Sequence, residues 1–119
     1  MSQENVEAVR ASFDHWRDGR MGEWIETLDP DIEWDISAHP LPDFPNSGSG
    51  RDALVGHLGA YLSGWNDYEP SIKELIDRED EVVVIVHERA RMRDSDMVLD
   101  RDLPHVWTVR DGRGVRLRV

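Results

Sequence analysis

The sequence contains no cysteine, and its apolar runs fall short of the roughly 18 residues that a membrane-spanning helix requires. Its first ten residues, MSQENVEAVR, have neither the basic start nor the apolar stretch of a secretory signal. A chain without cysteine has no disulfide framework and suits a reducing compartment. We therefore expect a cytoplasmic protein that does not contact membranes.

Common sequence motifs for nucleotide, metal and serine-hydrolase sites are also missing. The sequence has no P-loop, no pair of histidines at metal-ligand spacing and no Gly-x-Ser-x-Gly elbow. Its 25 acidic and 14 basic side chains give a net charge of -11, which repels a polyanion such as nucleic acid. These absences predict a protein that uses no metal or cofactor and does not bind nucleic acid.

The 119 residues fit one domain, residues 1–119, because domains commonly have about 50 to 250 residues. Apolar residues at helical spacing predict helices over residues 3–18, 22–28 and 51–64. Alternation of Ile32, Trp34 and Ile36 with acidic residues predicts a strand with one buried face. The proline- and glycine-rich segment 39–50 predicts a long loop of the kind that often borders a binding site.

The second half of the chain has the pattern of strands throughout. We expect strands over residues 69–76, 82–93, 97–110 and 115–119, and the short polar turns between them predict antiparallel neighbours. The fold class is therefore α+β, with three helices from the N-terminal half closing a curved antiparallel sheet around a small, mostly apolar pocket.

Three polar residues interrupt the apolar, inward faces of the two longest strands. Glu88 follows Val82, Val84 and Val86 at every second position, and Arg101 and His105 alternate in the same way with Leu99, Leu103 and Trp107. A carboxylate or imidazole in an apolar cavity costs free energy unless it is paired, and such surroundings also suit proton transfer. The three are either candidates for chemistry or a set that satisfies itself inside the sheet.

The pairing of these strands is harder to derive from the sequence. A turn at Asp94-Ser95-Asp96 places Glu88 opposite the outward Asp102, so we expect a bulge or a shifted turn, with Pro104 as a natural place for it. On the outward faces, we expect arginines 89, 91 and 93 to lie near Asp100 and Asp102.

His57 and Tyr61 lie four residues apart on the third predicted helix, so their side chains share one side of it. Together they could reach one site, but the same spacing suits a solvated face. We favour the solvated face.

Four segments resemble the SnoaL-like branch of the nuclear transport factor 2-like superfamily, which includes ketosteroid isomerases, polyketide cyclases and limonene-epoxide hydrolases. They are SQENV at 2–6, LDPDIEW at 28–34, GRDAL at 50–54 and HVWTVRDG at 105–112. The resemblance implies a cone-shaped curved sheet whose mouth is closed by helices, and a homodimer formed through the sheet.

The resemblance also implies roles for single residues. Isomerase-like members have a general-base aspartate at the end of the first strand, where this chain has Asp35 or Ile36, and alternation points Ile36 inward. Their second acid matches His105, and their tyrosine of the first helix falls near Ser12. Together with the inward position of Glu88 on its strand, this predicts His105 as a donor and Glu88 or Asp35 as the base.

The resulting hypothesis is an isomerase or cyclase that moves a proton on a small apolar carbonyl compound without a cofactor. The residues expected to contact that compound are Phe13, Trp16, Trp34, Ile36, Leu58, Val86, Leu103 and Trp107. A non-catalytic ligand-binding or dimerisation module is the alternative, and a hydrolase that adds water to an epoxide is a third possibility.

Overall fold

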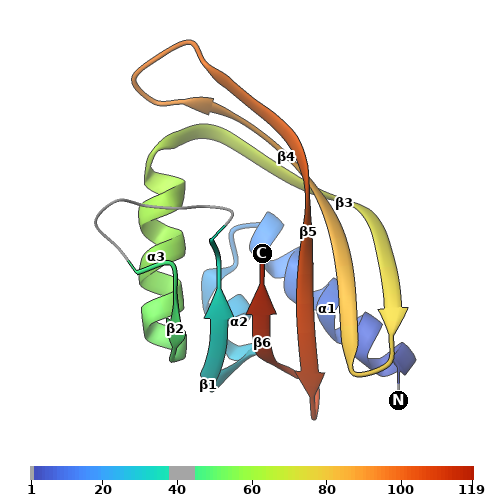
Figure 1. Cartoon of the computed structure of the whole chain (residues 1–119). Coiled ribbons are helices and arrows are strands. Elements are labelled where there is room, and N and C mark those ends of the chain that lie inside the picture. Colours follow the sequence, from blue (N-terminus) through green and yellow to red (C-terminus); the bar gives the residue numbers. More distant parts are fainter. Residues whose placement is uncertain (1, 38–44) are drawn as a thin grey trace.

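A computed structural model describes residues 2–37 and 45–119 (Figure 1). The helices are α1 (Ser2–Arg17), α2 (Met21–Glu26) and α3 (Arg51–Ser63). The strands are β1 (Leu28–Asp35), β2 (Ser47–Ser49), β3 (Trp65–Arg78), β4 (Glu81–Met92), β5 (Val98–Arg110) and β6 (Arg113–Arg118). The predicted α+β class is confirmed. The predicted loop 39–50 lies partly outside the described residues, and its last part forms the short strand β2.

The six strands of the described ranges form one sheet in the order β2-β1-β6-β5-β4-β3. All neighbours are antiparallel except β1 and β6, which are parallel, so the expectation of purely antiparallel pairing is wrong at this point. Asp111 and Gly112, with φ of 52° and 78°, form the tight turn that reverses the chain after β5. This turn fixes the direction of β6 against β5, whereas no turn joins β6 to β1, so their pairing is free to be parallel.

The register of β4 and β5 differs from the expected one. Four residues, Arg93 to Asp96, lie between Met92 and Met97, and the Met92 amide donates to the Met97 carbonyl at 2.8 Å. Glu88 therefore faces Arg101 and not Asp102, and the pairing of the two strands runs without a shift past Pro104. The predicted bulge at Pro104 is wrong. Because Pro104 lies beyond the end of β6, β5 has only one neighbour there and tolerates the missing donor.

Two apolar clusters fill the space between the sheet and the helices. The first joins α2, β1 and α3 and consists of Trp24, Leu28, Ile32, Trp34, Ile36, Leu54 and Leu117. The second joins α1 to the inner face of β4 and β5 and consists of Val9, Val82, Val84, Val86 and Val109. Figure 1 shows α1 and α2 behind the sheet and α3 beside β1. Residues of both clusters line the cavity described below.

The outer face of the long strands carries polar side chains. Asp102 contacts Lys73 Nζ at 2.6 Å and His87 Nδ1 at 2.7 Å, and Asp100 contacts His87 Nε2 at 3.0 Å. The carboxylates thus pair with a histidine and a lysine, although the register does place Arg89 opposite Asp100 as expected.

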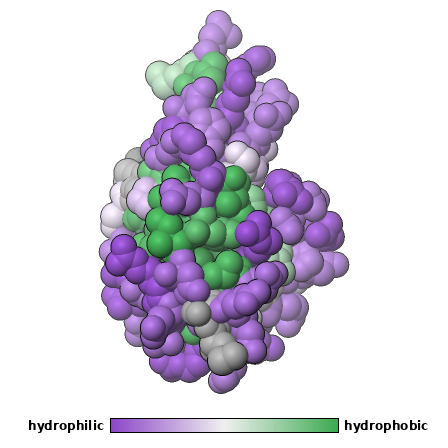
Figure 2. All heavy atoms as spheres, turned by 90° about the vertical axis from the view of Figure 1, so that its right-hand side faces the viewer, coloured by the Kyte–Doolittle hydropathy of each residue, from purple (hydrophilic) through white to green (hydrophobic). Residues whose placement is uncertain are grey.

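Seen from the side of β3, most of the surface is hydrophilic around a central apolar area (Figure 2). The hairpin of β4 and β5 projects beyond the body, and its tip exposes Met97 and Val98. No helix in residues 2–37 and 45–119 is long and apolar enough to cross a membrane.

Candidate ligand pocket

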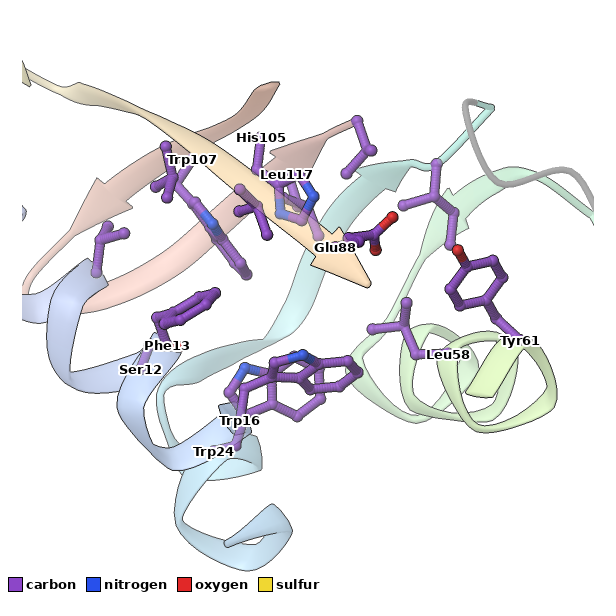
Figure 3. Close-up of a pocket in the computed structure, with 15 residues that line it drawn as sticks. Ser12, Phe13, Trp16, Trp24, Leu58, Tyr61, Glu88, His105, Trp107 and Leu117 are labelled. Atoms are coloured by element: carbon purple, nitrogen blue, oxygen red, sulfur yellow. The ribbon is translucent and has the colours of Figure 1, made fainter. Parts of the chain in front are cut away.

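A cavity lies between α1, α2, α3 and the inner face of the sheet (Figure 3). About 60 Å³ is open to the centres of water molecules, which is room for a few waters or for a small ligand. Its lining consists of Val9, Ser12, Phe13, Trp16, Trp24, Ile36, Leu58, Tyr61, Val84, Val86, Glu88, His105, Trp107, Leu117 and Val119. Most of these side chains are apolar, so the few polar ones determine its chemistry.

Glu88 is the central polar group, with 1 % of its surface exposed. Tyr68 Oη donates a hydrogen bond to its Oε1 at 2.7 Å, and Arg101 Nε donates to its Oε2 at 3.1 Å. Arg101 also donates through Nη2 to Tyr61 Oη at 3.2 Å. One guanidinium therefore links the buried carboxylate of β4 to a tyrosine of α3.

This arrangement makes the burial of an ionised Glu88 tolerable. A buried carboxylate is strongly destabilising alone, but a guanidinium and a phenol offset much of that cost. Burial raises the pKa of both Tyr61 and Tyr68, and the nearby negative charge of Glu88 raises each pKa further. Both phenols therefore remain protonated near neutral pH and act as hydrogen-bond donors.

His105 occupies a different part of the cavity. It lies on β5 opposite Val84, four residues along β4 from Glu88, which corresponds to about 13 Å of strand. Figure 3 shows its ring beside Leu117 and Trp107, whereas the carboxylate of Glu88 points toward Tyr61. A ligand that meets both polar groups therefore has to lie along the apolar face between them.

Aromatic rings form much of the opposite wall. Trp16 of α1 and Trp24 of α2 pack with ring centroids 4.8 Å apart, and Trp16 also meets Tyr68 edge-on at 6.4 Å. Ser12, which lies where the resemblance places a tyrosine, shares a hydrogen bond of 2.8 Å with Thr27. It therefore ties α1 to the end of α2 and places no phenol in the cavity.

Eight of the eleven residues predicted for the site line this cavity: Phe13, Trp16, Ile36, Leu58, Val86, Glu88, His105 and Trp107. Three lie outside the lining that the described residues form. Asp35 is exposed and accepts hydrogen bonds from Ser37, because it points to the opposite side of β1 from Ile36. Trp34 packs in the core, where its indole donates to the Gly50 carbonyl at 3.2 Å. Leu103 is half-buried opposite Val86 but contributes no lining surface.

The expected solvated face of the third helix is wrong, because His57 is 1 % and Tyr61 9 % exposed. Both extend the apolar side that begins at Leu54, and this spacing was the available signal. His57 lies near Trp34, with ring centroids 5.8 Å apart, and near Asn46 Oδ1 at 3.4 Å. Burial lowers the pKa of His57, so its neutral form is favoured.

Sequence reasoning also missed Trp24 and Tyr68. Trp24 lies within the short helix predicted at residues 22–28, and its place in the pocket depends on how that helix packs against α1. Tyr68 precedes the strand expected at 69–76, whereas β3 begins at Trp65. Among the residues that the structure describes, no group of three or more acidic, histidine or cysteine side chains is arranged to hold a metal ion.

Comparison with known proteins identifies the family. The model of the SnoaL-like domain matches residues 9–117, which is nearly the whole chain. The chain belongs to the SnoaL-like domain family. No curated protein matches its sequence significantly.

Solved structures show the same fold over nearly the full length of this SnoaL-like domain. Bal32a, from a soil-derived mobile gene cassette, superposes with a TM-score of 0.84 at 20% identity over 98% of this chain and 88% of its own. An NTF2-like protein of unknown function from Burkholderia pseudomallei gives 0.82 at 20% identity, covering 99% and 89%. TerC, co-crystallised with polyporic acid, gives 0.79 at 23% identity, covering 97% and 88%.

Proposed function

We propose that this SnoaL-like protein binds a small, largely apolar carbonyl compound in the cavity and moves a proton on it. Glu88 takes the proton from the carbon next to the carbonyl, the electron pair of that bond moves toward the carbonyl oxygen to give an enolate, and His105 supplies a proton to a carbon of the conjugated enolate that reaches its end of the cavity. The observation that carries this proposal is the fully buried carboxylate of Glu88 facing into an apolar cavity.

The surroundings of Glu88 suit such a step. Apolar walls exclude water, and an oxygen that accepts one hydrogen bond retains further lone pairs as acceptors. Tyr68 and Arg101 hold the carboxylate in one orientation, which brings the base to the substrate ready aligned. A well-placed base contributes about 10² to 10⁴ in rate. That TerC was co-crystallised with polyporic acid supports a small-molecule role for this fold.

The alternative is a protein that binds such a compound without turning it over. The hydrogen bonds of Tyr68 and Arg101 to Glu88 favour this reading, because a buried carboxylate whose two oxygens are both hydrogen-bonded has a structural role without any chemistry. The two functions share one pocket and differ only in whether a proton is exchanged.

Exchange of hydrogen for deuterium separates them. 2-Indanone is a compact ketone with exchangeable protons next to its carbonyl, and NMR in heavy water follows their loss. We expect the protein to accelerate exchange, and Glu88→Gln to lower the protein-dependent rate by about 10²-fold or more. Asp35→Asn is the matched control, because it neutralises a carboxylate outside the cavity. Binding of 2-indanone without accelerated exchange would instead support the non-catalytic function.

His105 is tested by the isomerisation of an unsaturated ketone, in which one proton leaves the carbon next to the carbonyl and another joins the far carbon of the conjugated enolate. His105→Gln keeps a polar side chain of similar size but does not transfer protons, so we expect slower isomerisation with little change in the exchange of 2-indanone. Thermal unfolding shows whether each variant is folded. Isomerisation that is unaffected by this substitution would remove His105 from the mechanism.

We further propose that the protein forms a homodimer through the outer face of the sheet. The paired residues Ile76, Val83 and Val106 place an apolar row across β3, β4 and β5, and Ile85 with Pro104 form the next row. Light scattering after size-exclusion chromatography is expected to give twice the mass of 13.7 kDa, and Val83→Arg to give the single mass. A monomeric wild-type protein at about 100 μM would contradict this proposal.

A further inference from the structure

The protein needs a group that orients the carbonyl oxygen of its ligand, and the two polar parts of the cavity are not equally suited to this task. The proton that Glu88 removes and the oxygen that becomes negative belong to neighbouring atoms of the ligand. A donor to that oxygen must therefore lie beside Glu88, within a few ångströms of the base. His105, about 13 Å further along the strands, faces another part of the cavity.

Tyr61 lies where that donor is required. It belongs to α3, lines the cavity, is 9 % exposed, and directs its hydroxyl toward the carboxylate of Glu88 in Figure 3. Arg101 Nη2 donates to its oxygen at 3.2 Å. Because a guanidinium carries only donors, the Tyr61 oxygen accepts in this bond, and its own O–H acts as a donor. The bond from Arg101 also draws electron density from the phenol and strengthens that donor.

The charges around Tyr61 restrict what it can bind. The carboxylate of Glu88 disfavours a ligand carboxylate at this end of the cavity, and the guanidinium of Arg101 disfavours an ammonium group. The two charges pair at 3.1 Å, so the local environment suits an uncharged acceptor.

We propose that Tyr61, positioned by Arg101, is the specificity-determining residue of the pocket and selects ligands with an uncharged carbonyl oxygen next to Glu88. The inference rests on the proposed function, since it assigns the polar group that Tyr61 contacts in the same cavity. The inference adds that the hydrogen bond to the carbonyl oxygen of the ligand comes from α3 and not from His105.

Three ligands of one shape test the inference: 2-indanone, indane, which lacks the oxygen, and indane-2-carboxylate. Trp16, Trp24 and Trp107 line the cavity, so quenching of tryptophan fluorescence can report binding. The wild-type protein is expected to bind 2-indanone about 3- to 10-fold more tightly than indane, as one neutral hydrogen bond provides. Indane-2-carboxylate is expected to bind more weakly than indane.

Tyr61→Phe removes one hydroxyl and is expected to abolish the preference for 2-indanone over indane while leaving the affinity for indane unchanged. Tyr68→Phe is the matched control, because it removes the other phenol bonded to this network, from a residue outside the cavity lining. It is expected to keep the preference. Binding of indane by each variant shows that its pocket remains formed.

A preference that survives Tyr61→Phe and disappears in His105→Gln would overturn the inference and assign the carbonyl contact to His105. Equal affinities of the wild-type protein for 2-indanone and indane would also overturn it. Both binding measurements are independent of whether the protein transfers a proton. If Glu88→Gln leaves the exchange rate unchanged while the preference for 2-indanone still depends on Tyr61, the proposed proton transfer is refuted and this inference stands.

Discussion

Glu88 and Asp102 are both acidic, both take part in ion pairs and lie on neighbouring strands, but they point to opposite faces of the same sheet. Glu88 is 1 % exposed and its partner Arg101 is 35 % exposed, whereas the side chains of Asp102 and Lys73 are 40 % and 60 % exposed. Water can replace the partner of Asp102 but not the partner of Glu88. The comparison teaches that two similar ion pairs contribute differently to stability, because one is shielded from water and the other is exposed to it.

The largest difference is expected when the inner pair is broken. Arg101→Met removes the guanidinium that pairs with the buried carboxylate of Glu88. Removing one member of a buried pair costs about 3 to 5 kcal/mol, and the partial exposure of Arg101 reduces our expectation to about 2 to 3 kcal/mol. Urea unfolding measures this. The double variant Glu88→Leu/Arg101→Met is expected to recover part of the loss, and a double variant less stable than the single one would contradict this account.

Substitutions of two adjacent valines allow the inner and outer faces of the sheet to be compared without the effect of charges. Val82 points inward and is 0 % exposed, whereas Val83 points outward and is half-buried. Val82→Ala is expected to cost about 2 kcal/mol, from lost burial and a residual cavity. Val83→Ala is expected to cost less than about 1 kcal/mol in the isolated subunit. Urea unfolding at low protein concentration checks both values, and a larger cost for Val83 that grows with protein concentration would show that a partner covers the outer face.

The inner side of the molecule also buries His57, and this burial should make the stability of the protein depend on pH. Burial places the pKa of folded His57 below its unfolded value of about 6.5. The unfolded chain therefore binds more protons as the pH falls, and stability declines below about pH 6.5. We expect His57→Gln to lose less stability than the wild-type protein between pH 7 and pH 5, as measured by urea unfolding. Equal losses would show that burial of His57 does not contribute.

The smallest effect is expected on the outer face. Lys73→Met removes one partner of Asp102, whose pKa is lowered mainly by Lys73 and also by His87. Since the group is exposed, solvent takes over the role of the lysine, and we expect no measurable change in stability at pH 7. Thermal unfolding at low and high salt checks this. A clear loss that salt abolishes would show that the outer charges act as a network.

The general fold followed from local patterns. Helical spacing in α1 and α3 and alternation in β1, β4 and β5 depend on which side chains are apolar, and that information is present in the sequence. The parallel pairing of β1 with β6 did not follow, because it joins segments about 80 residues apart and depends on packing across the whole sheet. The register of β4 and β5 was missed by one residue, since Arg93 is compatible with either the strand or the turn.

The candidate site was also predictable only where a local pattern of polar and apolar residues marks it. Glu88 and His105 stood out because alternation placed polar groups on an apolar face. Tyr61 did not, because helical residues of mixed polarity suit either a solvated or a buried side, and only the position of α3 against the sheet decides between them. The outward direction of Asp35 followed from the inward direction of Ile36, but the distance of Trp34 from the cavity did not.

The four-residue loop between Met92 and Met97 has a consequence for how the sequence of this protein can change. Side chains alternate between faces, so the pairing that this loop closes decides which half of β5 faces the cavity. A slip of the pairing by one residue would turn the strand over, so that Asp100 and Asp102 face the apolar interior while Arg101 and His105 face water. A change in the length of this hairpin is therefore tolerated only where the loop absorbs it and the two strands keep their pairing.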